Sequence, residues 1–194
     1  MDAAKQNLMN QYNKEAPNYD SSKASQFATQ SYPYVLNTLM PINFNNILDV
    51  GCGTGTLLRK ILDERPQVKA YGLDLSEGML TIAREKLPKR VELVWGEAES
   101  LPYDNKRFEL VVMVNSLRFF LNPEQAVKEG YRVLKPGGKL VICDMLTSGI
   151  MKLFSEKKML SEIEVRNALS LAGFDVINFM KNIPSGYIAT GDKR

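Results

Sequence analysis

The stretch NILDVGCGTGT, residues 46–56, decides the fold of this 194-residue chain. It opens with an apolar run of the length of a buried strand and then places glycine at three alternate positions, Gly51, Gly53 and Gly55. Apolar residues follow at the spacing of one helix face until Pro66. Residues 46–66 therefore predict a strand, a tight glycine turn and a helix.

Strand and helix patterns continue to alternate toward the C-terminus. Further strands are predicted at residues 68–73, 91–95, 108–114, 139–143, 175–180 and 186–190. The run FELVVMV (108–114) is almost wholly apolar, which is typical of a strand in the middle of a parallel sheet. No helix separates the last two strands, so they are expected to pair as an antiparallel hairpin at one edge. The predicted fold class is α/β, a doubly wound, mostly parallel, seven-stranded, Rossmann-like sheet with a C-terminal antiparallel hairpin.

The first forty residues predict helices. One helix is expected to begin after Asp2 and to be interrupted at Pro17, and a second covers roughly residues 25–40, where Pro33 argues for a break. No repeat, low-complexity tract or linker marks a second domain. We therefore expect a single domain, residues 1–194, in which residues 1–41 form a helical lid and residues 46–194 form the core.

Composition excludes several classes of function. The chain has no histidine, which removes histidine triads, histidine bases and histidine metal ligands, and two cysteines are too few for a four-cysteine zinc site. The net charge of +3 comes with dispersed basic residues, so no nucleic-acid partner is expected. Neither a secretion signal nor an apolar run of about 18 residues is found, which favours a cytoplasmic protein without a membrane span. We expect a monomer or a homodimer that holds no metal.

An acidic residue ends the second predicted strand. Asp74 lies 19 positions after Gly55, and doubly wound folds bind ligands at the carboxyl ends of their strands. A carboxylate there accepts hydrogen bonds from both hydroxyls of a ribose. Thr56 stands where a dinucleotide site has its third glycine, and no Gly-Lys-Ser/Thr sequence provides for a triphosphate. The glycine turn alone also fits a purely structural role, but together with Asp74 it favours an adenosine with a short zwitterionic sulfonium tail.

The motifs resemble those of a known family. ILDVGCGTGTLL (47–58), YGLDLSEGML (71–80), VWGEAESLPYDNKRFELVVMVNSLRFF (94–120), RVLKPGGKLVICDM (132–145) and AGF (172–174) stand in the order found in class I S-adenosylmethionine-dependent methyltransferases. The likeness is strongest to the small-molecule and quinone-type subgroup (methyltransferase domain 11-like), whose N-terminal helix often carries a pair like Tyr19-Asp20. This resemblance implies S-adenosylmethionine as the cofactor.

The resemblance also implies which residues bind that cofactor. At the methionine end it implies Asp49, the backbone of Gly51, Cys52 and Gly53, and a close helix start at Gly55. At the adenosine end it implies Asp74 on the ribose hydroxyls, Leu75 and Met79 on the adenine face, and Gly96, Glu97 and Ala98 at the adenine edge. Asn115 is expected to bind the amino group through its carbonyl, and Tyr12 or Tyr19 to close over the methionine end.

The function implied is methyl transfer to a small-molecule acceptor by in-line displacement. No catalytic residue is assigned, because a tyrosine, Asp20, Asp144 and water all stay open as a base. Arg118 stands where relatives often have histidine, and either binds an anionic acceptor or is solvated.

Two further expectations concern the lid and the rival functions. About seventeen residues separate Cys143 from Ser161, so the N-terminal segment is expected to supply most of the cover and to be mobile without cofactor. A non-catalytic S-adenosylmethionine-binding partner or sensor module stays open as an alternative. A nicotinamide-dependent oxidoreductase is disfavoured by Thr56 and by the terminal hairpin.

Overall fold

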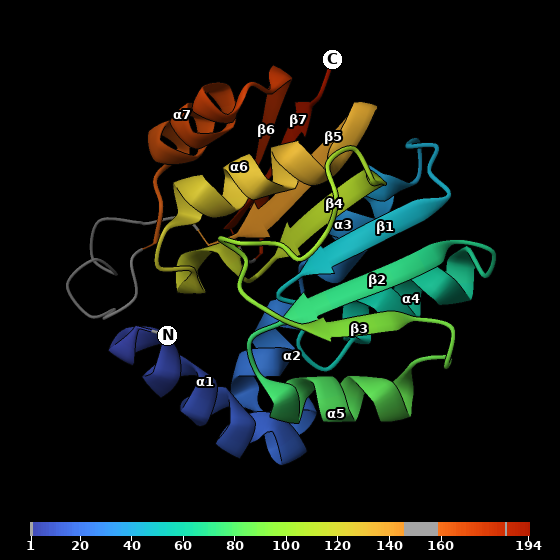
Figure 1. Ribbon diagram of the computed structural model, residues 1–194, viewed down its shortest axis with the longest axis vertical. Helices are drawn as coiled ribbons and strands as arrows, with labels where there is room; N and C mark the ends of the chain where they lie inside the picture. Colours follow the sequence, from blue (N-terminus) through green and yellow to red (C-terminus); the bar gives the residue numbers. More distant parts are fainter. Residues whose placement is uncertain (1, 146–158, 185) are drawn as a thin grey trace.

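One seven-stranded sheet forms the centre of the computed structural model, which describes residues 2–145, 159–184 and 186–194. The strands lie in the order β3-β2-β1-β4-β5-β7-β6 (Figure 1). Their bounds are β1 (Asn46–Val50), β2 (Lys69–Asp74), β3 (Glu92–Trp95), β4 (Phe108–Val114), β5 (Leu134–Asp144), β6 (Asp175–Ile183) and β7 (Gly186–Asp192). Strands β1 to β5 pair in parallel, whereas β7 runs antiparallel to both β5 and β6. The predicted doubly wound sheet with its antiparallel C-terminal hairpin is confirmed.

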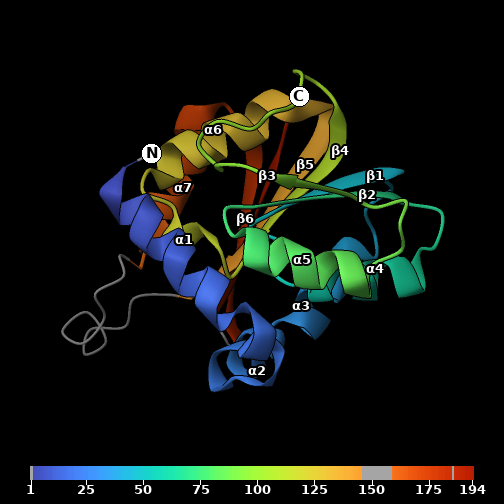
Figure 2. The same ribbon diagram turned by 60° about the horizontal axis from the view of Figure 1, so that its bottom comes forward.

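Helices cover both faces of the sheet (Figure 2). One layer contains α3 (Tyr32–Leu39), α4 (Thr56–Glu64) and α5 (Glu77–Lys86), and the other contains α6 (Pro123–Val133) and α7 (Glu162–Ala172). Each layer packs its apolar residues against one face, which gives two separate hydrophobic clusters of buried side chains. Strand β4 is shared by both clusters, since all its apolar residues are buried. This two-sided burial explains its continuous apolar sequence.

Side-chain caps fix the starts of several helices. Ser76 and Asn122 accept backbone N–H bonds at the starts of α5 and α6, and Ser161 with Glu164 forms a capping box at the start of α7. Gly173 ends α7 in the left-handed conformation with φ of 100°.

The start of β5 differs from the prediction. It begins at Leu134 instead of Lys139, and its pairing with β4 shifts register between Phe108 and Leu110. Pro136 cannot continue a helix, and Gly137 adopts a φ of 79° in this irregular stretch. Residues 134–138, which the sequence prediction left outside the strand, therefore belong to the sheet. The short connection expected between Cys143 and Ser161 lies largely outside the described residues, because residues 146–158 are not among them.

The N-terminal segment is more finely divided than predicted. It consists of α1 (Ala3–Glu15), the short 3-10 helix η1 (Ala16–Ser21), α2 (Lys23–Thr29) and α3. Asp2 caps α1, and Pro17 lies in η1 as expected for an interruption. Pro33 lies in the first turn of α3, where proline is tolerated. The predicted break therefore lies just before α3 and not within it.

The strand order places a topological switch point between β1 and β4. The chain adds β2 and β3 on one side of β1 and then returns to add β4 on the other. Doubly wound folds bind ligands beyond the carboxyl ends of the strands at such a point. In Figure 1, α1 lies across these carboxyl ends. Within the described ranges, no helix combines the length and apolarity needed to cross a bilayer.

Candidate functional site

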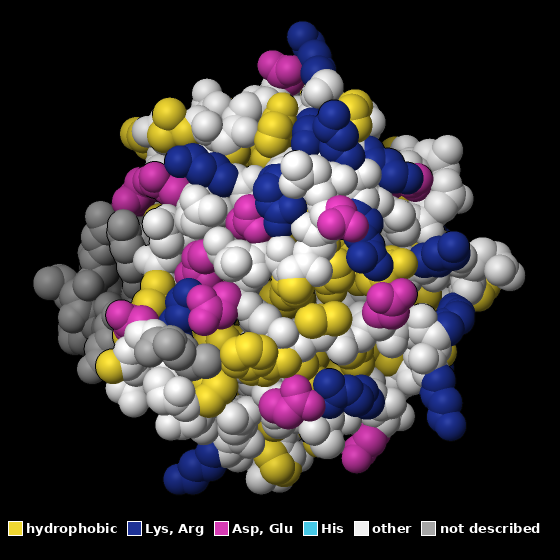
Figure 3. All heavy atoms as spheres, in the orientation of Figure 1, with side chains coloured by type: hydrophobic (Ala, Val, Ile, Leu, Met, Phe, Trp, Pro, Cys, Tyr) yellow, Lys and Arg dark blue, Asp and Glu magenta, His cyan; other side chains and the backbone are white. Residues whose placement is uncertain are grey.

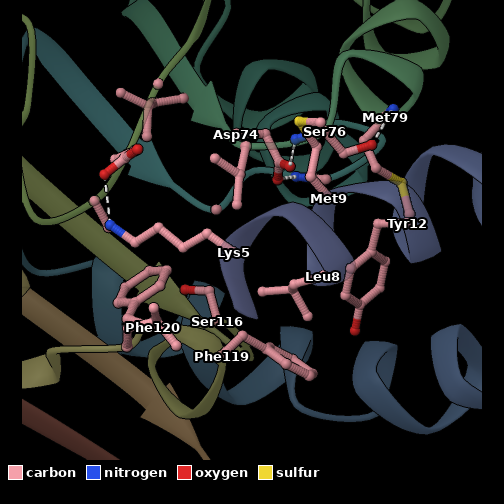
Figure 4. A pocket seen from close by; sticks show the side chains of 18 of the residues that line it. Lys5, Leu8, Met9, Tyr12, Asp74, Ser76, Met79, Ser116, Phe119 and Phe120 are labelled. Carbon is pink, nitrogen blue, oxygen red and sulfur yellow. Dashed lines mark hydrogen bonds and ion pairs between the residues drawn. The ribbon is translucent and has the colours of Figure 1, made fainter. Parts of the chain in front are cut away.

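A cleft opens at the carboxyl ends of the parallel strands, beside the switch point. Its volume is about 780 Å³ including the open mouth. One wall comes from α1 and the opposite wall from segments that follow β1, β2, β3 and β4 (Figure 4). Ten of the thirteen predicted cofactor positions line it: Tyr19, Gly51, Gly53, Asp74, Leu75, Met79, Gly96, Glu97, Ala98 and Asn115.

The glycine loop after β1 is tied down on one side and open on the other. The N–H groups of Gly51 and Cys52 donate to the carbonyl oxygen of Leu73 at 2.7 and 3.0 Å, which fastens the loop to β2. Gly51 has a φ of 80°, and a Cβ there would lie 2.5 Å from the Cβ of Ser116. A Cβ on Gly53, by contrast, would meet no atom within 4 Å. The backbone at Gly53 therefore borders open space in the cleft, as close approach of a ligand requires.

Asp74 connects the end of β2 to the glycine loop. Its Oδ2 accepts the N–H of Gly53 at 2.8 Å, and its Oδ1 accepts the N–H of Ser76 at 2.9 Å. Burial raises the pKa of this carboxyl, and the backbone donors of Ser76, Gly53 and Leu75 oppose the rise. A carboxylate offers about four acceptor positions. Asp74 therefore keeps acceptor capacity for a ligand in the cleft, where Figure 4 shows its side chain.

Asp49 lies at the end of β1, immediately before the glycine loop, and is only 2% exposed. Burial, and to a smaller extent the charge of Asp74, raises the pKa of Asp49 to about 8. Among the described residues, no hydrogen bond contributes to stabilising its ionised form. A buried carboxyl in this state strongly favours the arrival of a positively charged group.

Three predicted positions do not line the cleft: Asp49, Cys52 and Gly55. The sulfur of Cys52 lies against Gly72 of β2, and burial raises the pKa of its thiol well above the usual value. Gly55 starts α4 with a φ of 76° and packs where a Cβ would lie 2.6 Å from Leu87. In this structure the side chain of Cys52 and the position of Gly55 support the loop from behind.

The end of the cleft assigned to adenine is closed by charged side chains. The ammonium of Lys5 in α1 lies 2.5 Å from a carboxylate oxygen of Glu97 and 3.1 Å from one of Glu99. Met79 of α5 is 2% exposed and Ala98 is 5% exposed, so apolar surface lies beside these charges. Figure 4 shows Lys5 reaching along the cleft.

Asn115 has a strained backbone and an occupied side chain. Its φ of 57° is left-handed, which is uncommon for a residue other than glycine. Its side-chain amide donates to the Ala28 carbonyl oxygen and to Oγ of Ser31, both at 3.1 Å. The amide therefore fastens β4 to the N-terminal segment, and a ligand contact by Asn115 is left to its backbone.

Sequence reasoning assigned no cofactor role to most of α1 or to the segment after β4. Lys5, Leu8, Met9 and Tyr12 line the cleft, as do Phe119, Phe120 and Leu121. The first four follow the i, i+3, i+4, i+7 spacing of one helix face, and α1 buries none of its residues fully. The sequence signal for this wall was the spacing of these residues on one face of the predicted N-terminal helix.

Comparison with known proteins finds similarity to methyltransferases. A family model described as a methyltransferase domain matches residues 48–142. The chain is also 39% identical over 109 residues to a demethylmenaquinone methyltransferase of Clavibacter sepedonicus, over 55% of this chain and 44% of that protein. Residues 48–142 therefore match a methyltransferase domain, the class that the sequence motifs resemble.

One further sequence and one solved structure are also similar. An uncharacterized methyltransferase of Bacillus subtilis is 34% identical over 110 residues, covering 56% of this chain and 61% of the relative. The crystal structure of a methyltransferase from Thermotoga maritima has the same fold, with a TM-score of 0.76 at 22% identity over 96% of this chain and 100% of that one. The chain spans about half the length of the curated relatives it matches.

The matched methyltransferase domain implies S-adenosylmethionine as the cofactor, and the cleft of this chain fits it. The open space over Gly53 accommodates a ligand close to the backbone, and Asp74 keeps acceptor capacity for ribose hydroxyls. Asp49 is buried directly before the glycine loop, and no cation among the described residues compensates its charge, which suits an ammonium in the adjoining cleft.

Proposed function

We propose that this chain transfers a methyl group from S-adenosylmethionine to a small-molecule acceptor. The observation that carries the proposal is a single cleft that combines the predicted cofactor positions with an additional apolar wall. This apolar wall consists of residues from α1 and from the segment after β4, namely Leu8, Met9, Phe119, Phe120 and Leu121. The name of the Clavibacter relative, demethylmenaquinone methyltransferase, supports an acceptor of small-molecule size.

The surface supports a small acceptor over nucleic acid. On the face in Figure 3, Lys and Arg side chains are interspersed with Asp and Glu instead of forming a basic stripe. Hydrophobic side chains gather lower on that face, in the region where Figure 1 shows α1 and the strand ends. A nucleic-acid site calls for clustered positive charge.

In this proposal the chain acts mainly by positioning. S-adenosylmethionine, when bound, supplies a methyl group that its sulfonium has already activated. Asp74 would hold the ribose, Asp49 would face the ammonium, and the backbone of Gly51 and Gly53 would contact the methionine end. The apolar wall would exclude water and orient the acceptor, and such orientation contributes several kcal/mol to rate.

The acidic and phenolic groups near the cleft are poorly suited to act as a base that removes a proton from the acceptor. Burial raises the pKa of Asp20, but hydrogen bonds from Lys86 and two threonines outweigh burial, so the pKa lies below its usual value. Asp144 forms an ion pair with Arg118. Burial raises the pKa of Tyr12 above its usual range. The proposed acceptor therefore reacts in the ionisation state that it already has near neutral pH.

We also propose that residues 1–41 act as a lid on the core, residues 46–194. Several polar links fasten this segment to the core: Lys5 to Glu97 and Glu99, Asn13 to Ser76 and Gly78, Asp20 to Thr54 and Lys86, and Ala28 and Ser31 to Asn115. The apolar face of α1 borders the cleft and not the core, so the stability of α1 depends on what fills the cleft.

Amide hydrogen exchange tests the lid. With saturating S-adenosylhomocysteine, the amides of α1 are expected to exchange about tenfold more slowly than in the free chain, because the ligand buries the apolar face of that helix. The amides of β4 serve as the control and are expected to be protected equally in both states. Equal protection of α1 with and without ligand would contradict the lid.

Turnover tests the proposed activity. Labelled S-adenosylmethionine is incubated with the chain and a panel of small metabolites, and at least one acceptor is expected to become labelled. Affinity for S-adenosylhomocysteine is measured in parallel. Tight binding without transfer to any acceptor would point to the alternative, a non-catalytic binding partner or sensor module. Absence of binding would contradict both.

A further inference from the structure

Arg118 is held in a fixed position beside the cleft. It lies after β4 in the short 3-10 helix η2 (Leu117–Phe119). Its backbone N–H donates to Oδ2 of Asp144 at 3.0 Å, and its guanidinium forms an ion pair with Oδ1 of the same carboxylate. Asp144 is 2% exposed at the end of β5. One buried carboxylate therefore orients both the backbone and the side chain of Arg118.

The guanidinium lies against the aromatic part of the cleft wall. Its central carbon is 4.4 Å from the ring centre of Phe119. The ring of Phe119 packs 5.6 Å from that of Tyr12, and Tyr12 packs 6.1 Å from Tyr19. All three rings line the cleft, and Figure 4 shows Phe119 next to Tyr12.

Among the residues that the structure describes, Asp144 occupies only part of the hydrogen-bonding capacity of Arg118. A guanidinium has five N–H donors in a rigid fork, and Nη1 of Arg118 donates to Oδ1 of Asp144. Its side chain keeps 15% exposure. The other titratable groups that face it are the phenols of Tyr12 in α1, Tyr19 in η1 and Tyr187 in β7. An arginine fork fixed from behind by a carboxylate is suited to bind a second carboxylate in front.

We propose that Arg118, which stacks on the cleft residue Phe119 but is not itself a lining residue, binds a carboxylate at the margin of the cleft and is positioned by Asp144. The inference rests on the proposed function, since that function brings ligands to this part of the cleft. The carboxylate has two sources, an apolar acceptor that carries one or the methionine end of the cofactor. An acceptor with a carboxylate is already ionised at neutral pH, which agrees with the pairing of the acidic groups beside the cleft.

The test compares ligands that differ only in the carboxylate. The variants are Arg118→Gln, which removes the charge, and Arg118→Lys, which keeps the charge without the fork. Arg132→Gln is the matched control, because Arg132 also pairs with a carboxylate, Glu129 in α6, but among the described residues none of its hydrogen-bond partners lines the cleft. Calorimetric titration compares the affinity for S-adenosylhomocysteine with the affinity for 5′-methylthioadenosine, which lacks the amino-acid end. It then measures 2-naphthoate against 2-naphthamide on chains saturated with S-adenosylhomocysteine, and thermal unfolding checks the fold of each variant.

Two results support the proposal and identify the source. For an acceptor carboxylate, the wild type binds 2-naphthoate about tenfold or more tightly than 2-naphthamide, and Arg118→Gln removes the preference without changing S-adenosylhomocysteine affinity. If the carboxylate belongs to the cofactor, Arg118→Gln lowers the affinity for S-adenosylhomocysteine by about tenfold and leaves the affinity for 5′-methylthioadenosine unchanged. If Arg118→Gln fails to fold, Arg118→Lys is expected to give a partial loss in the same comparison.

Two results overturn the proposal. One is a folded Arg118→Gln variant that changes neither comparison. The other is an equal effect from Arg132→Gln, which would show a general loss of structure. A wild-type chain that does not bind S-adenosylhomocysteine contradicts the proposed function instead, so the two failures are distinguishable.

Discussion

Replacing Asp74 by alanine is expected to weaken S-adenosylhomocysteine binding by about 100-fold or more, because each hydrogen bond to a charged group contributes roughly 1.5–3 kcal/mol and two ribose hydroxyls lose their acceptor. The substitution also releases the N–H groups of Gly53 and Ser76, which Asp74 holds at 2.8 and 2.9 Å. The glycine loop keeps its bonds to Leu73, so the chain is expected to stay folded. Calorimetric titration gives the affinity, and circular dichroism gives the melting temperature.

Asp63→Ala is the matched control for this prediction. Asp63 is another aspartate, but it pairs with Arg59 on the exposed surface of α4 and does not line the cleft. Its replacement is expected to leave affinity within about twofold, as is usual for surface substitutions. An Asp74→Ala variant with undiminished affinity would show that the nucleoside binds elsewhere.

Replacing Asp49 by asparagine is expected to flatten the dependence of stability on pH. The folded chain raises the pKa of Asp49 from 3.8 to about 8, so over that interval the folded state keeps a proton that the unfolded state has lost. The stability contributed by this proton is complete below about pH 4 and is lost as the pH rises toward 8. At about 1.4 kcal/mol per pKa unit, the loss is several kcal/mol as an upper limit. The asparagine variant carries no titrating group there.

Thermal unfolding without ligand, measured from pH 5 to pH 8, checks this prediction. The wild-type melting temperature is expected to fall more steeply than that of Asp49→Asn, and Asp63→Asn is expected to follow the wild type. Equal slopes for all three chains would mean that Asp49 titrates normally.

The same carboxyl predicts a pH dependence of cofactor affinity. An ammonium next to Asp49 favours the ionised carboxylate, so binding releases a proton while the free chain holds one. Affinity for S-adenosylhomocysteine is therefore expected to rise between pH 6 and pH 8 in the wild type and to rise less in Asp49→Asn. Titrations at three pH values would measure the difference.

Local chemistry accounts for the parts of the fold that the sequence predicts well. Continuous apolar runs such as residues 108–114 have a single favourable place in an α/β protein, and Ser76 or Ser161 mark helix starts through their own hydrogen bonds. The predicted start of β5 was wrong because residues 135–138 have a loop-like sequence but belong to the sheet. Backbone hydrogen bonds to a distant segment hold them there, including those that join Gly137 and Gly138 to Lys193. Such long-range bonds leave no local pattern.

The candidate site divides in the same way. Glycines and Asp74 are recognisable because their roles depend on their own backbone freedom and charge, and they meet at the end of adjacent strands. The cleft wall formed by α1 could not be predicted, because it depends on where that helix packs relative to the strand ends. Lys5, Leu8 and Tyr12 do not specify this position by themselves. The orientation of Arg118 by Asp144 joins residues 26 positions apart and required the structure.

Calorimetric titration of the wild-type chain with S-adenosylhomocysteine, beside NAD⁺ as a competitor of similar adenosine content, tests the central claim most directly. The account predicts saturable binding of S-adenosylhomocysteine at one site per chain, and no binding of NAD⁺ in the same concentration range. Tighter binding of NAD⁺, or no heat from S-adenosylhomocysteine at millimolar concentration, would contradict it.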